Sequence, residues 1–182
     1  MKIIVINGQG KVGKDSFVDY CKENNAYVQN LSTIDPIKAL ATKIGWNGQK
    51  TDRDRRFLSD LKDLTSKYND YPYIQTIKAI EDLIWDYHYY NLPTKNMIIF
   101  LHCREPEDID IWKRFHGART LLIRRRDVEE KHGNHADDNV FDMVYDYTIY
   151  NEGSLLDLKK EAEKFMKKVL DEEWQSRVER ER

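Results

Sequence analysis

A glycine-rich turn that carries one lysine is the stretch whose residue types and spacing best fit a chemical task. Gly8, Gly13 and Lys14 match the pattern G-x-x-x-x-G-K, in which backbone N–H groups cradle phosphate oxygens and the lysine adds a mobile charge. Gly8, Gly10 and Gly13 also match the dinucleotide fingerprint G-x-G-x-x-G. That fingerprint needs an acid about twenty residues on, closing the second strand, where residues 26–30 end in amides. We therefore favour a phosphate-binding loop, with the dinucleotide site as the alternative.

The loop and the first turn of the helix after it supply the expected contacts to a bound nucleotide: Gly8, Gly10, Lys11, Val12, Gly13, Lys14, Asp15 and Ser16. Asp15 stands where the pattern usually has a Ser or Thr that binds Mg²⁺. A carboxylate is a hard oxygen ligand, and Ser16 can supply the hydroxyl one place later, so both are candidate metal ligands. The alternative for Asp15 is a first-turn acid that interacts favourably with the helix dipole.

Two groups of charged residues follow the second expected strand. Asp35 precedes Pro36, and it either caps a helix or orients a substrate hydroxyl. Lys38, one turn on, either reaches an anionic acceptor or faces solvent. Arg56 opens an amphipathic helix together with arginines at positions 53 and 55. Because arginine is unfavourable at a helix N-terminus, a bound anion is one explanation and a solvated face the other.

Further arginines follow the third and fourth expected strands. Arg104 comes two residues after His102, which ends a buried strand where many phosphate-loop enzymes place an acid that positions Mg²⁺. Arg124 and Arg126 belong to an arginine run that opens a turn-rich segment, 124–140, which we interpret as a lid. Charges that close over a transferring phosphoryl group act best when water is excluded. The alternative for Arg104 is a structural salt bridge. The alternative for the arginines at 124–126 is a solvated basic turn.

These observations define two candidate sets. The candidate catalytic residues are Lys14, Asp15, Asp35, Arg104, Arg124 and Arg126. A second metal group lies in the expected lid, although its irregular spacing favours a polar loop: His132, His135, Asp137 and Asp138.

The elements that must position these residues alternate between strands and helices. After the strand that opens the chain, apolar runs predict strands at 26–30, 97–101, 119–123 and 146–150. Helical patterns cover 13–24, 35–45, 53–67, 74–90 and 106–116. A loop broken by Pro72 is expected at 68–73. Ser154 and Asp157 resemble a capping box for a last helix, whose expected buried face is Leu155, Leu158, Ala162, Phe165 and Val169. This alternation predicts an α/β fold with a five-stranded parallel sheet and helices on both faces.

Length and composition bound the function. A chain of 182 residues is expected to form one domain, here residues 1–173, followed by a charged tail at 174–182. The net charge of −2 argues against a general binder of nucleic acids or membrane surfaces. No apolar run reaches membrane-spanning length and no signal peptide is recognisable. Cys21 and Cys103 lack metal-ligand spacing, which suits a reducing cytoplasm.

Several segments together resemble the phage-type deoxynucleoside monophosphate kinases, distant relatives of adenylate kinase. The loop ending Gly-Lys-Asp-Ser is similar to their Gly-Lys-Asp-Thr variant, and Asp35-Pro36-Ile37-Lys38 is similar to their Asp-Pro-Leu-Lys segment. The stretches 54–61, 97–107 and 146–156 also resemble the family, although His102 stands where its members often have Asp. The resemblance implies a P-loop NTPase-like three-layer fold with a helical acceptor-binding region at about 36–92.

The resemblance further implies ATP as phosphoryl donor, Mg²⁺, and a (deoxy)nucleoside monophosphate as acceptor. Lys14 and one lid arginine would then stabilise the transferring group. The expected acceptor-binding residues are Asp35, Lys38, Arg56 and Arg104. Animal-type phosphomevalonate kinases share the Gly-Lys-Asp variant, so a non-nucleotide phosphorylated acceptor is one alternative. A nucleotide-binding module or regulatory ATPase is another. The sequence does not identify the base or the sugar of the acceptor. It also leaves the oligomeric state open, and a homodimer is one possibility.

Overall fold

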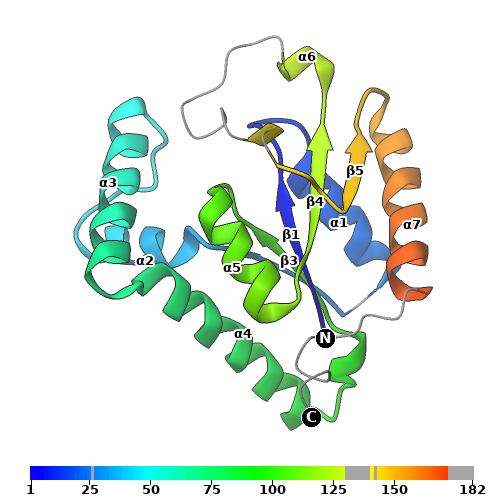
Figure 1. The fold of residues 1–182 in the computed structure, drawn as a ribbon, viewed down its shortest axis with the longest axis horizontal. Coiled ribbons are helices and arrows are strands. Elements are labelled where there is room, and N and C mark those ends of the chain that lie inside the picture. Colours follow the sequence, from blue (N-terminus) through cyan, green and yellow to red (C-terminus); the bar gives the residue numbers. More distant parts are fainter. Residues whose placement is uncertain (26, 130–139, 142, 172–182) are drawn as a thin grey trace. The chain divides into compact units, whose positions relative to one another are not determined.

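The computed structural model describes residues 1–25, 27–129, 140–141 and 143–171 of the chain. The chain forms two compact units (Figure 1). The sheet unit comprises Met1–Asn30 and Lys95–Arg182, and the helical unit comprises Leu31–Thr94. The strands are β1 (Lys2–Asn7), β2 (Val28–Ser32), β3 (Ile98–His102), β4 (Arg119–Arg124) and β5 (Tyr147–Tyr150). The helices of the sheet unit are α1 (Lys14–Asn24), α5 (Pro106–His116), α6 (Arg126–Glu129) and α7 (Leu155–Asp171).

The five strands form one sheet in the order β2-β3-β1-β4-β5. β1 pairs in parallel with β3 on one side and with β4 on the other, and β4 pairs in parallel with β5. The chain therefore moves to opposite sides of β1 as it proceeds. In an open α/β sheet, ligands bind outside the carboxyl ends of the strands at such a switch point. The loop that follows β1 is therefore at the position where a ligand is expected to bind.

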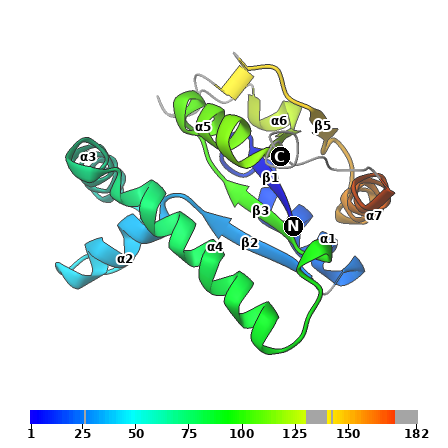
Figure 2. The same ribbon diagram turned by 60° about the horizontal axis from the view of Figure 1, so that its bottom comes forward.

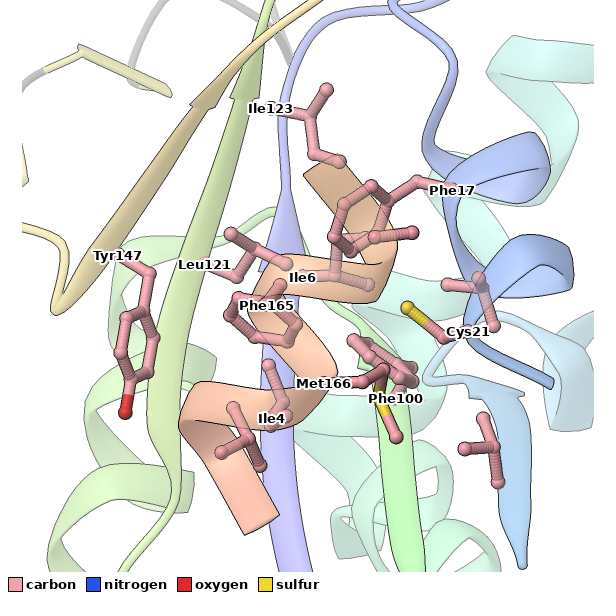
Figure 3. Packing of buried hydrophobic residues seen from close by; sticks show 14 of the residues in the cluster. Ile4, Ile6, Phe17, Cys21, Phe100, Leu121, Ile123, Tyr147, Phe165 and Met166 are labelled. Carbon is pink, nitrogen blue, oxygen red and sulfur yellow. The ribbon is translucent and has the colours of Figure 1, made fainter. Parts of the chain in front are cut away.

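Helices cover both faces of this sheet. α5 contacts β1 and β4 on one face, and α1 packs against α7 on the other (Figures 1 and 2). Between α1, α7 and the sheet lies an aromatic core in which Phe165 is 5.5 Å from Phe17 and 6.1 Å from Phe100, ring centre to ring centre (Figure 3). β1 is buried on both sides from Ile3 to Asn7, as expected for a central parallel strand. The predicted α/β fold, a five-stranded sheet with helices on both faces, is confirmed.

The helical unit contains α2 (Asp35–Lys43), α3 (Asp52–Asn69) and α4 (Tyr71–Tyr89), and each of the three contacts the other two. A capping box starts α3, because the side chain of Thr51 accepts from the N–H of Asp54 while the Asp54 carboxylate accepts from the N–H of Thr51. No helix in the described part of the chain is both long and apolar enough to cross a membrane.

Some expected boundaries were wrong. β2 begins two residues later than the predicted strand at 26–30. The loop expected at 68–73 is helical on both sides of Asp70, because Pro72 lies in the first turn of α4, where its missing N–H costs nothing. The capping box of Ser154 and Asp157 is confirmed, with the Ser154 Oγ 2.7 Å from the carboxylate. Leu155 is 66% exposed, so it does not belong to the buried face of α7.

Candidate active site

Several candidate site residues of the sheet unit lie at one edge of the sheet, at the carboxyl ends of four parallel strands. The phosphate-binding loop follows β1, and His102 is the last residue of β3. Arg124 ends β4, and Asn151 comes directly after β5. Since these strands run parallel, their carboxyl ends lie at the same edge of the sheet. This edge is the candidate active site.

Two glycines of the loop adopt backbone conformations that other residues rarely take. Gly8 has a φ of 139°, and a Cβ there would collide with the carbonyl oxygen of Ile123 on β4. Gly13 has a φ of 98°, and a Cβ there would lie 2.6 Å from the Asn151 side-chain nitrogen. Gly10 differs, because a Cβ would meet no described atom within 4 Å. The loop is therefore packed against β4 at Gly8 and against Asn151 and Leu158 at Gly13, and it has open space around Gly10 in its middle.

Lys14 lies in the first turn of α1 and folds back over the loop. Its ammonium group donates hydrogen bonds to the carbonyl oxygens of Gly8 and, at 2.7 Å, of Gln9. An ammonium group held over a loop of glycines is placed to bind the terminal phosphates of a nucleotide. Lys11, with a φ of 68°, also has the left-handed conformation, so the turn is sharp at a residue without the freedom of glycine.

Asn151 is a site residue that no chemical motif in the sequence marks. Its side chain is buried and donates a hydrogen bond of 2.9 Å to the carbonyl oxygen of Val12 in the loop. Its backbone N–H donates to the carbonyl oxygen of Arg124 at the end of β4. Asn151 thereby ties the phosphate-binding loop to the ends of β4 and β5. The resemblance of 146–156 to the kinase family was the only signal, and it gave no role.

Asn7 holds the other end of the loop. Its side-chain oxygen accepts from the N–H of Gly8 at 2.8 Å, and its amide nitrogen donates to the hydroxyl of Tyr145 at 2.9 Å. The Tyr145 hydroxyl donates in turn to the carbonyl oxygen of Val140. Burial raises the pKa of Tyr145 to about 12, so the hydroxyl keeps its proton at neutral pH. Tyr145 and Val140 are therefore linked by hydrogen bonds to the start of the phosphate loop.

Asp15 and His102 lie together at this edge. His102 Nε2 is 3.7 Å from the Asp15 carboxylate, and the side chains are 16% and 89% exposed. The exposed carboxylate of Asp15 is a suitable ligand for a divalent cation that is bound to nucleotide phosphates. Ser16, the next residue, is half-buried and has a hydroxyl that can serve in the same way. Within the described residues no group of three or more His, Cys, Asp or Glu side chains could hold a metal. A cation here would therefore need nucleotide oxygens and water to complete its shell.

The arginines at this edge differ in their surroundings. The Arg124 guanidinium lies 4.7 Å from the centre of the Phe141 ring and 5.9 Å from that of Tyr150, so it is stacked on aromatic faces. Arg126 begins α6; its side chain is exposed and its backbone N–H donates to Glu152. Arg104 is exposed just beyond β3. Arg104 and Arg126 are thus exposed residues, and Arg124 is stacked on aromatic rings.

The expected acceptor residues Asp35, Lys38 and Arg56 all belong to the helical unit. Asp35 is not the N-cap of α2, as one alternative had it, because Ile34 takes that position and no side chain caps the helix. Instead the Asp35 carboxylate pairs with Lys38 at 2.8 Å. Arg56 is exposed on α3. His132, His135, Asp137 and Asp138, most of the expected lid and the tail at 174–182 lie outside the described residues.

No family model matches the chain, and no curated protein matches it. Several solved structures resemble it. Dephospho-CoA kinase from Campylobacter jejuni has a TM-score of 0.49 and 15% identity, over 92% of this chain and 97% of that one. Shikimate kinase from Aquifex aeolicus has a TM-score of 0.46 and 10% identity, over 94% and 100%. The Mycobacterium tuberculosis APS kinase in complex with AMPPNP and APS has a TM-score of 0.46 and 9% identity, over 93% and 98%. These similarities are too distant to assign a family or a substrate.

Proposed function

We propose that the protein is a phosphotransferase that moves the terminal phosphoryl group of ATP to a (deoxy)nucleoside monophosphate, giving ADP and a nucleoside diphosphate. The observation that carries the proposal is the phosphate-binding loop, with Lys14 folded over it and open space at Gly10. The transfer needs a divalent cation, which the resemblance implies is Mg²⁺, and Asp15 and Ser16 are the candidate ligands beside the phosphates. The segments that resemble the phage-type kinases support the choice of a nucleotide as acceptor.

Each charged group has a role in such a transfer. The reaction needs little covalent chemistry from the protein, so positioning and charge stabilisation supply most of the catalysis. Lys14 and the backbone of residues 8–16 bind the donor phosphates. Arg126, whose side chain is exposed, stabilises the charge on the transferring group. Arg124, stacked on Phe141, anchors the start of the lid.

The acceptor is proposed to bind through its phosphate and sugar. Arg104 of the sheet unit and Arg56 of the helical unit are exposed residues, and either guanidinium can match a phosphate in a two-pronged geometry. Asp35 and Lys38 form an exposed pair in the first turn of α2. An acceptor hydroxyl can bond to the Asp35 carboxylate, while Lys38 adds positive charge for the acceptor phosphate.

The test is a panel of nucleoside monophosphates, each mixed with the protein, ATP and Mg²⁺, with ADP release followed over time. At least one monophosphate should raise ADP release above the ATP-only control. Lys14→Ala should lower turnover by about 10²-fold or more, the scale seen when one charge-stabilising group is removed. Lys22→Ala is the matched control, because this exposed lysine lies in the last turn of the same helix and its ammonium group is 3.7 Å from the Asp19 carboxylate.

A second pair of variants separates a kinase from a nucleotide-binding module. Arg104→Gln should reduce acceptor-dependent turnover, whereas Arg114→Gln, an exposed arginine of α5 paired with Asp110 at 2.7 Å, should not. ADP release that no monophosphate stimulates would rule out the nucleotide acceptor. Stimulation by another phosphorylated small molecule would then favour a kinase with a non-nucleotide acceptor.

A further inference from the structure

The end of β3 carries an imidazole where the cation of a phosphate loop is expected to bind. His102 is in register with Ile6 of β1, the strand that leads into the loop. Asp15 follows Lys14 in the first turn of α1, and its carboxylate lies 3.7 Å from His102 Nε2. Both residues belong to the sheet unit. A nitrogen donor and an oxygen donor therefore face each other beside the expected donor phosphates.

These two atoms are close enough to become ligands of one cation after a small movement of the Asp15 side chain. Six-coordinate cations bind oxygen or nitrogen at about 2.1 Å, so neighbouring ligands lie about 3.0 Å apart and opposite ligands about 4.2 Å apart. The 3.7 Å between His102 Nε2 and the Asp15 carboxylate is longer than the separation of neighbouring ligands and shorter than that of opposite ligands, so the carboxylate must move closer to His102 for both to bind one cation as neighbours. The imidazole is largely buried while the carboxylate is 89% exposed, so Asp15 is free to adjust its rotamer around a cation.

The donor types indicate which cation is favoured. Mg²⁺ prefers oxygen ligands alone, whereas first-row transition-metal ions also bind imidazole well. Mn²⁺ accepts carboxylate, phosphate and imidazole together. We propose that Asp15 and His102 form a mixed oxygen–nitrogen site at the phosphate loop, and that this site selects a first-row transition-metal dication such as Mn²⁺ over Mg²⁺. This inference rests on the proposed function.

An ion pair is the competing explanation for the same contact. A protonated His102 would attract the Asp15 carboxylate directly and would exclude a cation from the nitrogen. The two explanations differ in one observable, which is a bond between His102 and the metal. Because Mn²⁺ is paramagnetic, a nitrogen bound to it gives a hyperfine coupling that an ion pair does not give.

The experiment uses the full chain labelled with ¹⁵N-histidine, Mn²⁺, and the β,γ-methylene analogue of ATP, which has no nitrogen in its phosphate bridge. Pulsed electron paramagnetic resonance should show a ¹⁵N coupling, both with the analogue and, at higher Mn²⁺ concentration, with Mn²⁺ alone. His102→Asn should abolish the coupling and weaken Mn²⁺ binding by about tenfold or more. His88→Asn, on an exposed histidine of α4, should change neither.

Competition with Mg²⁺ gives a second readout that does not depend on spectroscopy. Mg²⁺ should displace Mn²⁺ from the unmodified protein only in large excess, and His102→Asp, which replaces the nitrogen by oxygen, should lower that excess by about tenfold. Absence of ¹⁵N coupling in the labelled unmodified protein would overturn the mixed site, whatever the variants do. No acceptor is present, so a ¹⁵N coupling in a protein that phosphorylates no monophosphate would reject the proposed function and keep the site.

Discussion

Replacing Gly13 by alanine tests how the phosphate-binding loop is held. The φ of 98° costs a residue with a Cβ about 1–2 kcal/mol. The new Cβ would also lie 2.6 Å from the Asn151 side-chain nitrogen, so Asn151 must move away. The Val12 carbonyl oxygen, in a residue that is 1% exposed, then loses its hydrogen bond, at about 1–3 kcal/mol. Gly13→Ala should therefore lower the free energy of unfolding by about 2–5 kcal/mol.

A double-mutant cycle with Asn151→Ala isolates the contact. Asn151→Ala alone should cost about 1–3 kcal/mol, because it leaves the same carbonyl oxygen unpaired. The double variant loses that hydrogen bond once, so its cost should fall short of the sum of the single costs by about 1–3 kcal/mol. Gly48→Ala is the control for backbone strain, with a φ of 83° and no described atom within 4 Å of a Cβ.

The assay is urea unfolding followed by circular dichroism, with the four proteins of the cycle and the control measured under one buffer. Additive costs, within about 0.5 kcal/mol, would refute the argument that Asn151 and Gly13 act through one contact. A Gly48→Ala cost equal to that of Gly13→Ala would refute it as well, because strain alone would then account for the effect.

Three further predictions concern the frame around the site. Phe165→Ala should cost about 3–5 kcal/mol in urea unfolding, since its ring packs on Phe17, Phe100 and Tyr147, whereas Phe115→Ala, 69% exposed, should cost under about 0.5 kcal/mol. Burial raises the pKa of the Cys21 thiol, and Cys103 is buried too, so a thiol reagent at pH 8 should label neither until the protein unfolds; fast labelling of native protein would contradict this packing. The hydroxyl and N–H of Ser154 donate hydrogen bonds to the Asp157 carboxylate and hold its pKa below the ordinary 3.8. The ionised carboxylate therefore stabilises the folded protein fully above pH 3.8, and this contribution is lost as the pH falls through the lowered pKa of Asp157. Asp157→Asn should accordingly flatten the fall in urea midpoint below about pH 4, and an unchanged acid limb would count against the cap.

The sequence predicted the elements whose signal is local. The opening strand and the glycine pattern defined the phosphate loop. α5 covers the predicted residues 106–116, with Pro106 in its first turn and Gly117 just past its end. β3 is a continuous apolar run because it is buried on both faces. β2 is only half-buried after Val28, so its pattern was weak and its position was two residues off. Pro72 was interpreted as a break, although proline is equally at home in a first turn.

Features that depend on distant contacts could not be predicted. Asn151 reaches Val12 across 139 positions of the chain, and Asn7 reaches Tyr145 across 138. Nothing in a local pattern marks a buried amide as a partner of a loop so far away. The ion pair between Asp35 and Lys38 is a local contact. The sequence alone could not predict it, because an Asp before a Pro is equally compatible with a helix N-cap, a position that Ile34 takes here.

Following the terminal phosphate of ATP tests the central proposal most directly. The protein is incubated with γ-labelled ATP, a divalent cation and each nucleoside monophosphate, and the products are separated and counted. Phosphoryl transfer predicts that the label appears in a nucleoside diphosphate for at least one acceptor, and that Lys14→Ala lowers the rate of its appearance by about 10²-fold or more. Label found only in inorganic phosphate, or only in unreacted ATP, for every monophosphate would contradict the proposed kinase.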